Sequence, residues 1–352
     1  MTVVANKAEA TSWRFESVAR EGRWSVHRRR GSIRRISATP QGPILESLNA
    51  RPGSRLPRSE TPRPFAPIGQ PPRPAILAFY IMIHIMGGLL FNAAFGFYVV
   101  GLFHSGIAFL SKKDLFVRVA LYSVTVGFVF HTGFLVYQGV EKAFFPMIGL
   151  RESLAFFAWT VTLCFLIAQF RYRVRAMGLF LLPLVAAFML STVFIKASPI
   201  PDILRSSWVY FHSTFLFLAY GMFFVTFLAA VFYLLQEREL KRKKPRTFYY
   251  QLPSLSTLDD LFLKFLIWGF VFMTAGIVVG IIWAEQDWVR GWLRDPKVIA
   301  TMSTWVIYLA LLYLRLTAGW RGRRTALLSM IGFLSILFTF LCVSFFGGQH
   351  SF

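Results

Sequence analysis

The sequence predicts an all-α, polytopic membrane helix bundle of about eight transmembrane helices with a Trp-rich external loop domain. The chain has 352 residues, is 56% hydrophobic, contains 39 Phe residues and has a mean hydropathy of +0.55. Soluble domains rarely combine these values, so a membrane class is favoured. The apolar runs show no strand-like alternation, and lipid permits only helices or closed barrels.

Residues 1–75 differ from the rest of the chain. They carry fourteen Lys and Arg residues against five Asp and Glu residues, and they are rich in Pro, Ser and Gly. Such a segment buries too little apolar surface to offset the entropy lost on ordering, so we expect a disordered, basic tail. The transmembrane domain is then expected over residues 76–352.

Eight apolar runs of spanning length follow the tail. They cover residues 76–103, 118–139, 153–170, 176–195, 207–235, 261–283, 298–314 and 325–346. The loops after the first, third, fifth and seventh runs are basic, and the other loops are nearly neutral. The positive-inside bias therefore predicts that the basic loops are cytoplasmic. The net charge of +22 is assigned to these loops and the tail, so no nucleic-acid partner is predicted.

Several chemical classes are not supported by the sequence. Cys164 and Cys342 stand alone in apolar runs, so no disulfide, zinc site or thiol redox motif is predicted. The chain has no CxxCH motif and is therefore not itself a c-type cytochrome. It also shows no nucleophile or acid–base constellation of a conventional enzyme.

Two histidines are predicted to reach the outer surface. His212 lies near the start of the fifth run, one helical turn after Trp208, and His350 follows the eighth run. The segment DWVRGWLRDPK, between the sixth and seventh runs, reaches the same side of the membrane. This shared side holds whichever way the protein is oriented.

This combination suggests a haem docked at the membrane surface. Two neutral imidazoles can ligate one iron from opposite faces, indoles offer flat apolar surface, and Arg or Lys can pair with propionates. The alternative is that Trp288 and Trp292 are membrane-interface anchors, which are common at this depth.

From about residue 76 to its end, the chain resembles the CcsA (ResC) family of system II cytochrome c assembly. That family belongs with CcmC and CcmF to a wider haem-handling group. The matched segments are FFP…LRESLAFFAW, WVYFHSTFLFLAYG, GIIWAEQDWVRGWLRDPK and TAGWRGRRTALLSMIGF followed by the terminal GGQHSF.

The resemblance implies cytochrome c biogenesis with haem transport. With a CcsB/ResB-type membrane partner, such proteins move haem outward and hold it at a Trp-rich (WWD) domain. There the thiols of apocytochrome c add to the vinyl groups. The haem would be b-type, non-covalently bound cargo, and holocytochrome c synthase (haem lyase) activity would be shared with the partner. The implied location is the bacterial cytoplasmic membrane, with the site on the periplasmic face, or the thylakoid membrane.

The resemblance also assigns roles to residues of the external segment, 283–297. The implied axial ligands are His212 and His350. The implied indole platform is Trp283, Trp288 and Trp292. Asp295, Pro296 and Lys297 match the end of the family motif.

Three positions depart from the family pattern, and one of them is Val298, which stands where the family usually has Glu after Lys297. Arg294 stands where the family usually has Trp, and we hypothesise that it exchanges a stacking contact for a propionate contact. Tyr313 stands two residues before Arg315, where family members often carry an intramembrane haem-ligand histidine. Tyrosinate can ligate haem iron, but a neutral tyrosine is the alternative, so a transmembrane haem site is in doubt.

Three further ionisable residues lie within or near spans. His84 and His131 are each about eight residues from the outer end of their spans, and equal depth would permit a bis-histidine haem in the bilayer. A hydrogen-bonded core role is the alternative. Glu152, near the outer start of the third run, could cap that helix or stabilise the external domain.

Two other classes of function are alternatives for this sequence. A membrane electron-transfer subunit with b-type haem predicts histidine pairs at two depths, and the sequence has no inner-leaflet histidine. A secondary transporter predicts internal repeats and broken midplane helices, and no repeat is found.

Overall fold

The computed structural model describes residues 14–17, 24–27, 33–39, 42–45, 74–111, 113–142, 147, 149–196, 204, 206–241, 251–287 and 292–339. For the strands, for residues 74–84 and for Asp287, the backbone alone is described. The chain divides into two compact units, Met1–Pro71 and Pro72–Phe352.

The first unit contains a four-stranded antiparallel sheet in the order β1–β2–β3–β4. The strands are β1 (Arg14–Ser17), β2 (Trp24–His27), β3 (Ile33–Thr39) and β4 (Gly42–Leu45). In this register Phe15 pairs with Val26, and Val26 pairs with Arg34 on its other side. The disorder of residues 1–75 stays a prediction, and within this range the structure describes the backbone of these four strands. Their backbone N–H and C=O groups pair between neighbouring strands, which composition does not reveal.

The second unit is helical throughout its described residues. The helices are α1 (Pro74–Ser111), α2 (Asp114–Lys142), α3 (Leu150–Tyr172), α4 (Met177–Phe194), α5 (Ser207–Leu240), α7 (Leu255–Asp287), η2 (Trp292–Arg294), α8 (Pro296–Leu316) and α9 (Arg323–Leu337). Seven of these helices are long and apolar enough to cross a membrane, by length and composition. The predicted all-α membrane bundle is thus confirmed. The eighth predicted run, 325–346, begins in α9, and its residues 340–346 lie outside the described part.

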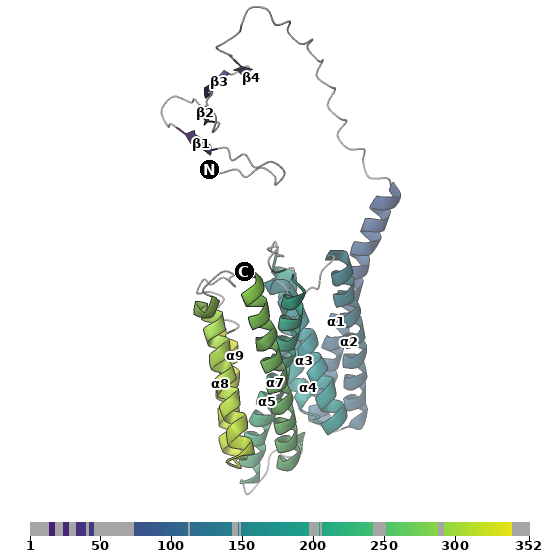
Figure 1. The fold of residues 1–352 in the computed structure, drawn as a ribbon. Helices are drawn as coiled ribbons and strands as arrows, with labels where there is room; N and C mark the ends of the chain where they lie inside the picture. The colour runs from purple at the N-terminus through teal and green to yellow at the C-terminus, as the bar shows by residue number, and fades with distance from the viewer. Residues whose placement is uncertain are drawn as a thin grey trace, which may run out of the picture. The chain divides into compact units, whose positions relative to one another are not determined.

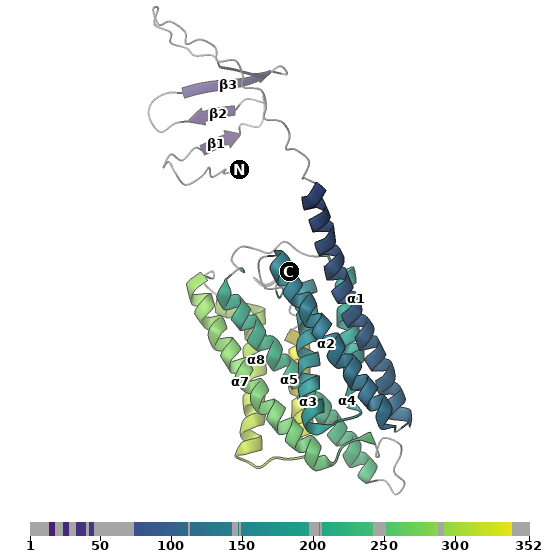
Figure 2. The ribbon, with the colours of Figure 1, turned by 90° about the vertical axis from the view of Figure 1, so that its right-hand side faces the viewer.

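The spanning helices pack as neighbouring pairs. Contacts join α1 to α2, α3 to α4, α5 to α7 and α8 to α9, and α3 also packs against α5. Figures 1 and 2 show α1 and α2 at one side of the bundle and α8 and α9 at the other. In the most apolar 18-residue stretch of each helix, 78% of the residues of α3 are buried, whereas 17% of those of α8 are buried. α3 is therefore the central helix, and α8 leaves most of its surface for lipid or a partner.

Aromatic rings fill the contact between α5 and the last two helices. The rings of Phe223 and Tyr308 are stacked with centroids 3.6 Å apart, and both side chains are fully buried. Phe227 and Phe333 stack at 4.6 Å. Flat rings allow these helices to meet closely, and each large ring adds dispersion contacts that lipid tails would not supply with the same fit.

An ion pair closes the end of the bundle where α7 begins and α8 ends. Arg315 lies inside the bundle, and its Nη2 is 2.5 Å from Oδ2 of Asp259. Its Nη1 donates to the carbonyl of Trp320 at 2.8 Å. One guanidinium therefore joins α7, α8 and the turn that leads to α9.

We predict that Asp259→Ala strongly destabilises the bundle, because it leaves the buried guanidinium without its carboxylate. The expected loss in free energy of unfolding is ~3 kcal/mol. Asp260→Ala is the matched control, since its partner Lys264 is half exposed and such pairs contribute ~1 kcal/mol or less. Thermal unfolding of the detergent-purified variants would measure both, and equal effects would contradict the prediction.

Candidate functional site

A cavity of about 210 Å³ lies at the end of the bundle where α5 and α8 begin and α7 ends. It is lined by Met147, Ser153, Leu204, Val209, His212, Ser213, Leu216, Phe217, Tyr220, Ile277, Gly280, Ile281, Trp283, Ala284, Trp292, Lys297, Val298, Thr301, Met302 and Thr339. Most of these side chains are apolar, and a few polar groups converge on the space. Such a pocket is typical of a site for a largely apolar ligand with few polar anchors.

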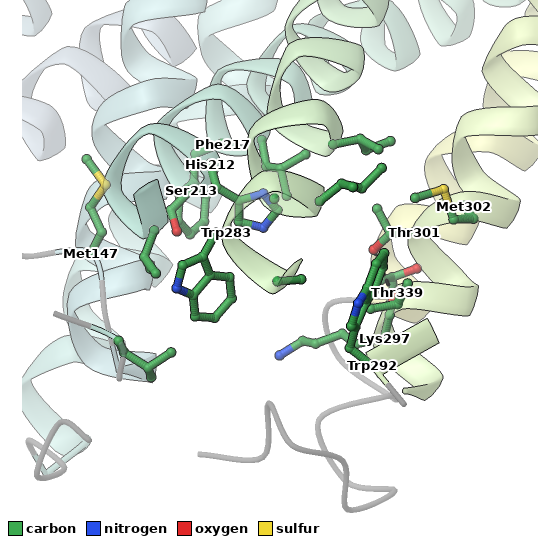
Figure 3. Close-up of a pocket in the computed structure, with 18 of the residues that line it drawn as sticks. Met147, His212, Ser213, Phe217, Trp283, Trp292, Lys297, Thr301, Met302 and Thr339 are labelled. Carbon is green, nitrogen blue, oxygen red and sulfur yellow. Dashed lines mark hydrogen bonds between the residues drawn. The ribbon is translucent and has the colours of Figure 1, made fainter. Parts of the chain in front are cut away.

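His212 is held in one orientation within this pocket. Its Nδ1 lies 2.8 Å from the backbone carbonyl oxygen of Gly276 on α7. Because a carbonyl oxygen only accepts, Nδ1 carries the proton of the neutral ring and Nε2 keeps its lone pair. Figure 3 shows the imidazole at the edge of the pocket, next to Trp283. The arrangement leaves one nitrogen of His212 able to bind a metal ion.

A glycine notch on α7 makes this position possible. A Cβ atom at Gly280 would lie 2.4 Å from Nδ1 of His212, and a Cβ at Gly276 would lie 2.9 Å from Leu216. The two glycines are four residues apart, so they share one face of the helix. Their missing side chains let α5 and α7 approach until the imidazole reaches the Gly276 carbonyl.

We predict that Gly280→Ala displaces the His212 ring, because a rigid imidazole 2.4 Å from the new methyl must move. Gly96→Ala is the control, since a Cβ atom at this helical glycine would meet nothing within 4 Å. Nitrogen chemical shifts of labelled histidine would report the tautomer of His212. We expect a change with Gly280→Ala alone. The same shifts in both variants would contradict the notch.

Two indoles flank the opening of the pocket. Trp283 is buried near the end of α7, and Trp292 lies in η2. Nε1 of Trp292 donates to Oε1 of Glu285 at 3.2 Å, which ties η2 back to α7. Figure 3 shows the two indoles on opposite sides of the space, with the Lys297 side chain extending between them.

Lys297 reaches this place because of the way α8 begins. Asp295 is the N-cap residue, and its Oδ1 accepts from the backbone N–H of Lys297 at 2.8 Å. Pro296 occupies the first turn, where its missing N–H costs nothing. Of the described residues that line the pocket, Lys297 alone carries a full charge. The pocket therefore pairs an apolar body with a single cationic anchor.

The segment between α2 and α3 forms another wall. Met147 lines the pocket, its backbone carbonyl accepts from Oγ of Ser153 at 2.8 Å, and its sulfur accepts from Thr214 at 3.4 Å. Glu152 is buried and lies 2.5 Å from Nζ of Lys142. This ion pair joins the end of α2 to the start of α3. Glu152 thus stabilises the wall that carries Met147 rather than lining the pocket itself.

We predict that Glu152→Ala costs about 1.5–3 kcal/mol of unfolding free energy, because it removes a charge-assisted hydrogen bond between a buried carboxylate and the partly exposed Lys142 ammonium. Glu237→Ala is the control, since its partner Lys241 is four residues away and exposed, and such pairs contribute about 0.3–0.5 kcal/mol. Denaturation in detergent would compare the two variants. A smaller loss for Glu152→Ala than for Glu237→Ala would reject this role.

The structure does not bring every predicted site residue to the pocket. Trp208 and Arg294 are exposed, and neither is among the described residues that line it. A propionate contact from Arg294 therefore has no support in this geometry. Trp288 and His350 lie outside the described residues. Thr339, eleven residues before His350, does line the pocket.

Tyr313 points away from the bundle. Its side chain is 63% exposed, whereas Arg315 is buried. Positions two residues apart on a helix differ by about 200°, so one side chain faces the interior and the other faces outward. Tyr313 therefore provides no ligand to the interior of this chain.

The expected equal depth of His84 and His131 is wrong. Close contacts between α1 and α2 pair Gly87 with Tyr137 and Tyr98 with Gly127. On this register His131 lies level with residue 93 or 94, so His84 is roughly 14–15 Å further along the bundle at the rise of an α-helix. His131 is fully buried, with Nδ1 3.2 Å from the hydroxyl of Tyr98. This agrees with the hydrogen-bonded core alternative.

Several pocket residues were not predicted from the sequence. Among them are Gly280, Met147, Thr301 and Ser213, and the Gly276 carbonyl that orients His212 was not predicted either. The glycines left one signal, a G-x₃-G spacing in an apolar run, which is typical of close helix packing. The others are ordinary membrane-helix residues until neighbouring helices are placed. Among the described residues, no cluster of three or more His, Cys, Asp or Glu side chains could hold a metal ion by itself.

Comparison with known proteins gives a consistent result. Residues 147–350 match the family described as Cytochrome C assembly protein. The chain is 29% identical over 322 residues to cytochrome c biogenesis protein CcsA of Gloeobacter violaceus, covering 75% of this chain and 95% of the relative. It is 30% identical over 247 residues to CcsA of Trieres chinensis, covering 60% and 79%.

A solved structure shares the fold. The protein named Cytochrome c Heme Lyase CcmF superposes with a TM-score of 0.56 at 18% identity, covering 74% of this chain and 47% of that chain. At this identity the likeness concerns the fold alone.

Proposed function

Because this chain belongs to the cytochrome c assembly protein family, we propose that it binds haem in the pocket at His212 and presents it for attachment to apocytochrome c. The observation that carries the proposal is the oriented His212 imidazole. The hydrogen bond from Nδ1 to the Gly276 carbonyl leaves the lone pair of Nε2 available to bind a metal ion, inside an apolar pocket flanked by indoles. Haem is here the non-covalently bound, b-type cargo.

The pocket offers groups that fit both the apolar ring and the carboxylates of a haem. Trp283 and Trp292 offer flat apolar faces to a macrocycle, and Lys297 can pair with a propionate carboxylate. Bound haem supplies vinyl groups for thioether formation. The chain's own residues bind and orient it, and they keep the reacting edge in one place.

His350 is proposed as the second axial ligand. Thr339 lines the pocket and precedes His350 by eleven residues. Eleven residues span at most ~36 Å when extended, so a return to the pocket is within reach. Trp288 belongs to the same external segment and is proposed as part of the indole platform.

The pocket is proposed to face the outer side of the membrane. The basic loops, including Arg171 to Arg175 and Arg321 to Arg324, lie at the opposite end of the alternating helices. By the positive-inside bias that end is cytoplasmic. A CcsB/ResB-type membrane protein is the proposed partner. α8, the least buried span, offers a surface for it.

An electron-transfer subunit with b-type haem is less well supported. That function needs histidine pairs at two depths. Within the described residues, His131 is packed among Tyr98 and Phe134 instead of lining a cavity.

We predict that His212→Ala and His350→Ala each shift the Soret band of the purified protein and weaken haem binding by about tenfold or more, a loss of ~1.4 kcal/mol. Added imidazole should partly restore the spectrum by filling the ligand position. His104→Ala is the control, because His104 lies outside the pocket lining and its Nδ1 is hydrogen-bonded to the Val100 carbonyl of its own helix. Unchanged spectra for both test variants would rule out the proposed ligation.

A further inference from the structure

The pocket has a thin wall between α7 and α8. Ile277, Gly280 and Ile281 line it from α7, and Val298 and Met302 line it from α8. Ile281 lines the pocket and is also 38% exposed. No described side chain covers Ile281 fully, and it lies on α7 between the bonds that this helix makes to α8 and η2.

Two tryptophan hydrogen bonds frame this wall. Toward the middle of the bundle, Nε1 of Trp305 donates to Oγ1 of Thr274 at 3.0 Å, and its ring stacks on Phe270 at 5.6 Å. At the other edge, Trp292 donates to Glu285 at 3.2 Å. Thr274 and Glu285 are eleven residues apart, which is about 16 Å along a helix. Between these two bonds, α7 and α8 diverge around the pocket.

The framed region lies at membrane depth. The apolar span of α7 extends to Gln286, and that of α8 begins at Pro296. Ile281 is five residues, or about 8 Å, inside the end of its span. Its neighbour Val278 is 51% exposed and faces away from the pocket. Lipid tails would therefore touch the outer side of this wall.

We propose that this α7–α8 wall is a lateral window through which a flat, amphipathic ligand of the haem class enters the pocket from the outer leaflet. The proposal rests on the proposed function and adds the route of loading. The distribution of charged and apolar residues at this window matches that of such a ligand lying in the membrane. Carboxylates at headgroup depth would meet Lys297 at the start of α8, while the apolar ring passes between Ile281 and Met302.

Two features explain why the window lies here. α5 and α7 are locked together by the glycine notch, so that wall cannot part without moving His212. Across the framed region, by contrast, the facing side chains are Ile281, Val298 and Met302, which can change rotamer without breaking a hydrogen bond. Opening therefore costs little at this wall.

The test compares two sources of haem. Purified full-length protein is placed in phosphatidylcholine vesicles, and haem is supplied either dissolved in the bilayer or as a complex with albumin in the water. We expect the wild-type Soret change to be faster from the bilayer. Because Ile281 also lines the pocket, the readout is the ratio of the two loading rates: Ile281→Trp should slow bilayer loading about tenfold more than aqueous loading, whereas Ile281→Ala should raise the ratio.

Val278→Trp is the matched control, because it adds the same ring on the lipid-facing side of the same helix turn. It should leave both rates unchanged. Equal slowing of both routes by Ile281→Trp, or no slowing of either, overturns the window while haem binding itself stands. Wild-type protein that binds no haem from either source in micelles or vesicles rejects the proposed function, and the window with it.

Discussion

The hydrogen bond from His212 to the Gly276 carbonyl sets the chemistry of the pocket. It requires α5 and α7 to lie closer than two ordinary side chains would allow, and Gly280 removes the atom that would prevent this. In lipid, apolar side chains gain little by leaving their surroundings, so close backbone approach and interhelical hydrogen bonds do much of the work of assembly. The same contact therefore packs two spans and selects the imidazole nitrogen that faces the pocket.

Buried ion pairs hold the two ends of the bundle. Glu152 and Lys142 join α2 to α3 beside the pocket, and Arg315 and Asp259 join α8 to α7 at the other end. Charges removed from water are tolerated only when they are paired at short range. Between these ends the helices meet through rings and small residues, which specify position by shape. The pocket thus lies at one end of the bundle, and the Glu152–Lys142 ion pair holds together the two helix ends that flank its Met147 wall.

Of the three departures from the family pattern, Arg294 and Tyr313 lie on outward-facing surfaces, whereas Val298 lines the pocket. Arg294 is exposed in η2, and Tyr313 is exposed on α8, while their neighbours Asp295 and Arg315 are buried and bonded. Asp295 and Arg315 are thus residues that this chain uses to fold, whereas Arg294 and Tyr313 lie where lipid, water or a partner would meet them.

Hydrophobicity and length were sufficient to predict the helical spans, because a membrane helix must be about 20 apolar residues long wherever it packs. The alternation of loops likewise placed His212, the Trp segment and the chain's end on one side, since parity does not depend on packing. The notch at Gly276 and Gly280, the wall at Met147 and the outward face of Tyr313 depended on which helix lies beside which. The true depths of His84 and His131 depended on the register of α1 against α2. The sequence determined which segments can span the membrane, because the lipid bilayer requires a minimum apolar length of every span. Only the tertiary structure decided which side chains meet, because this length requirement does not specify which helix packs against which.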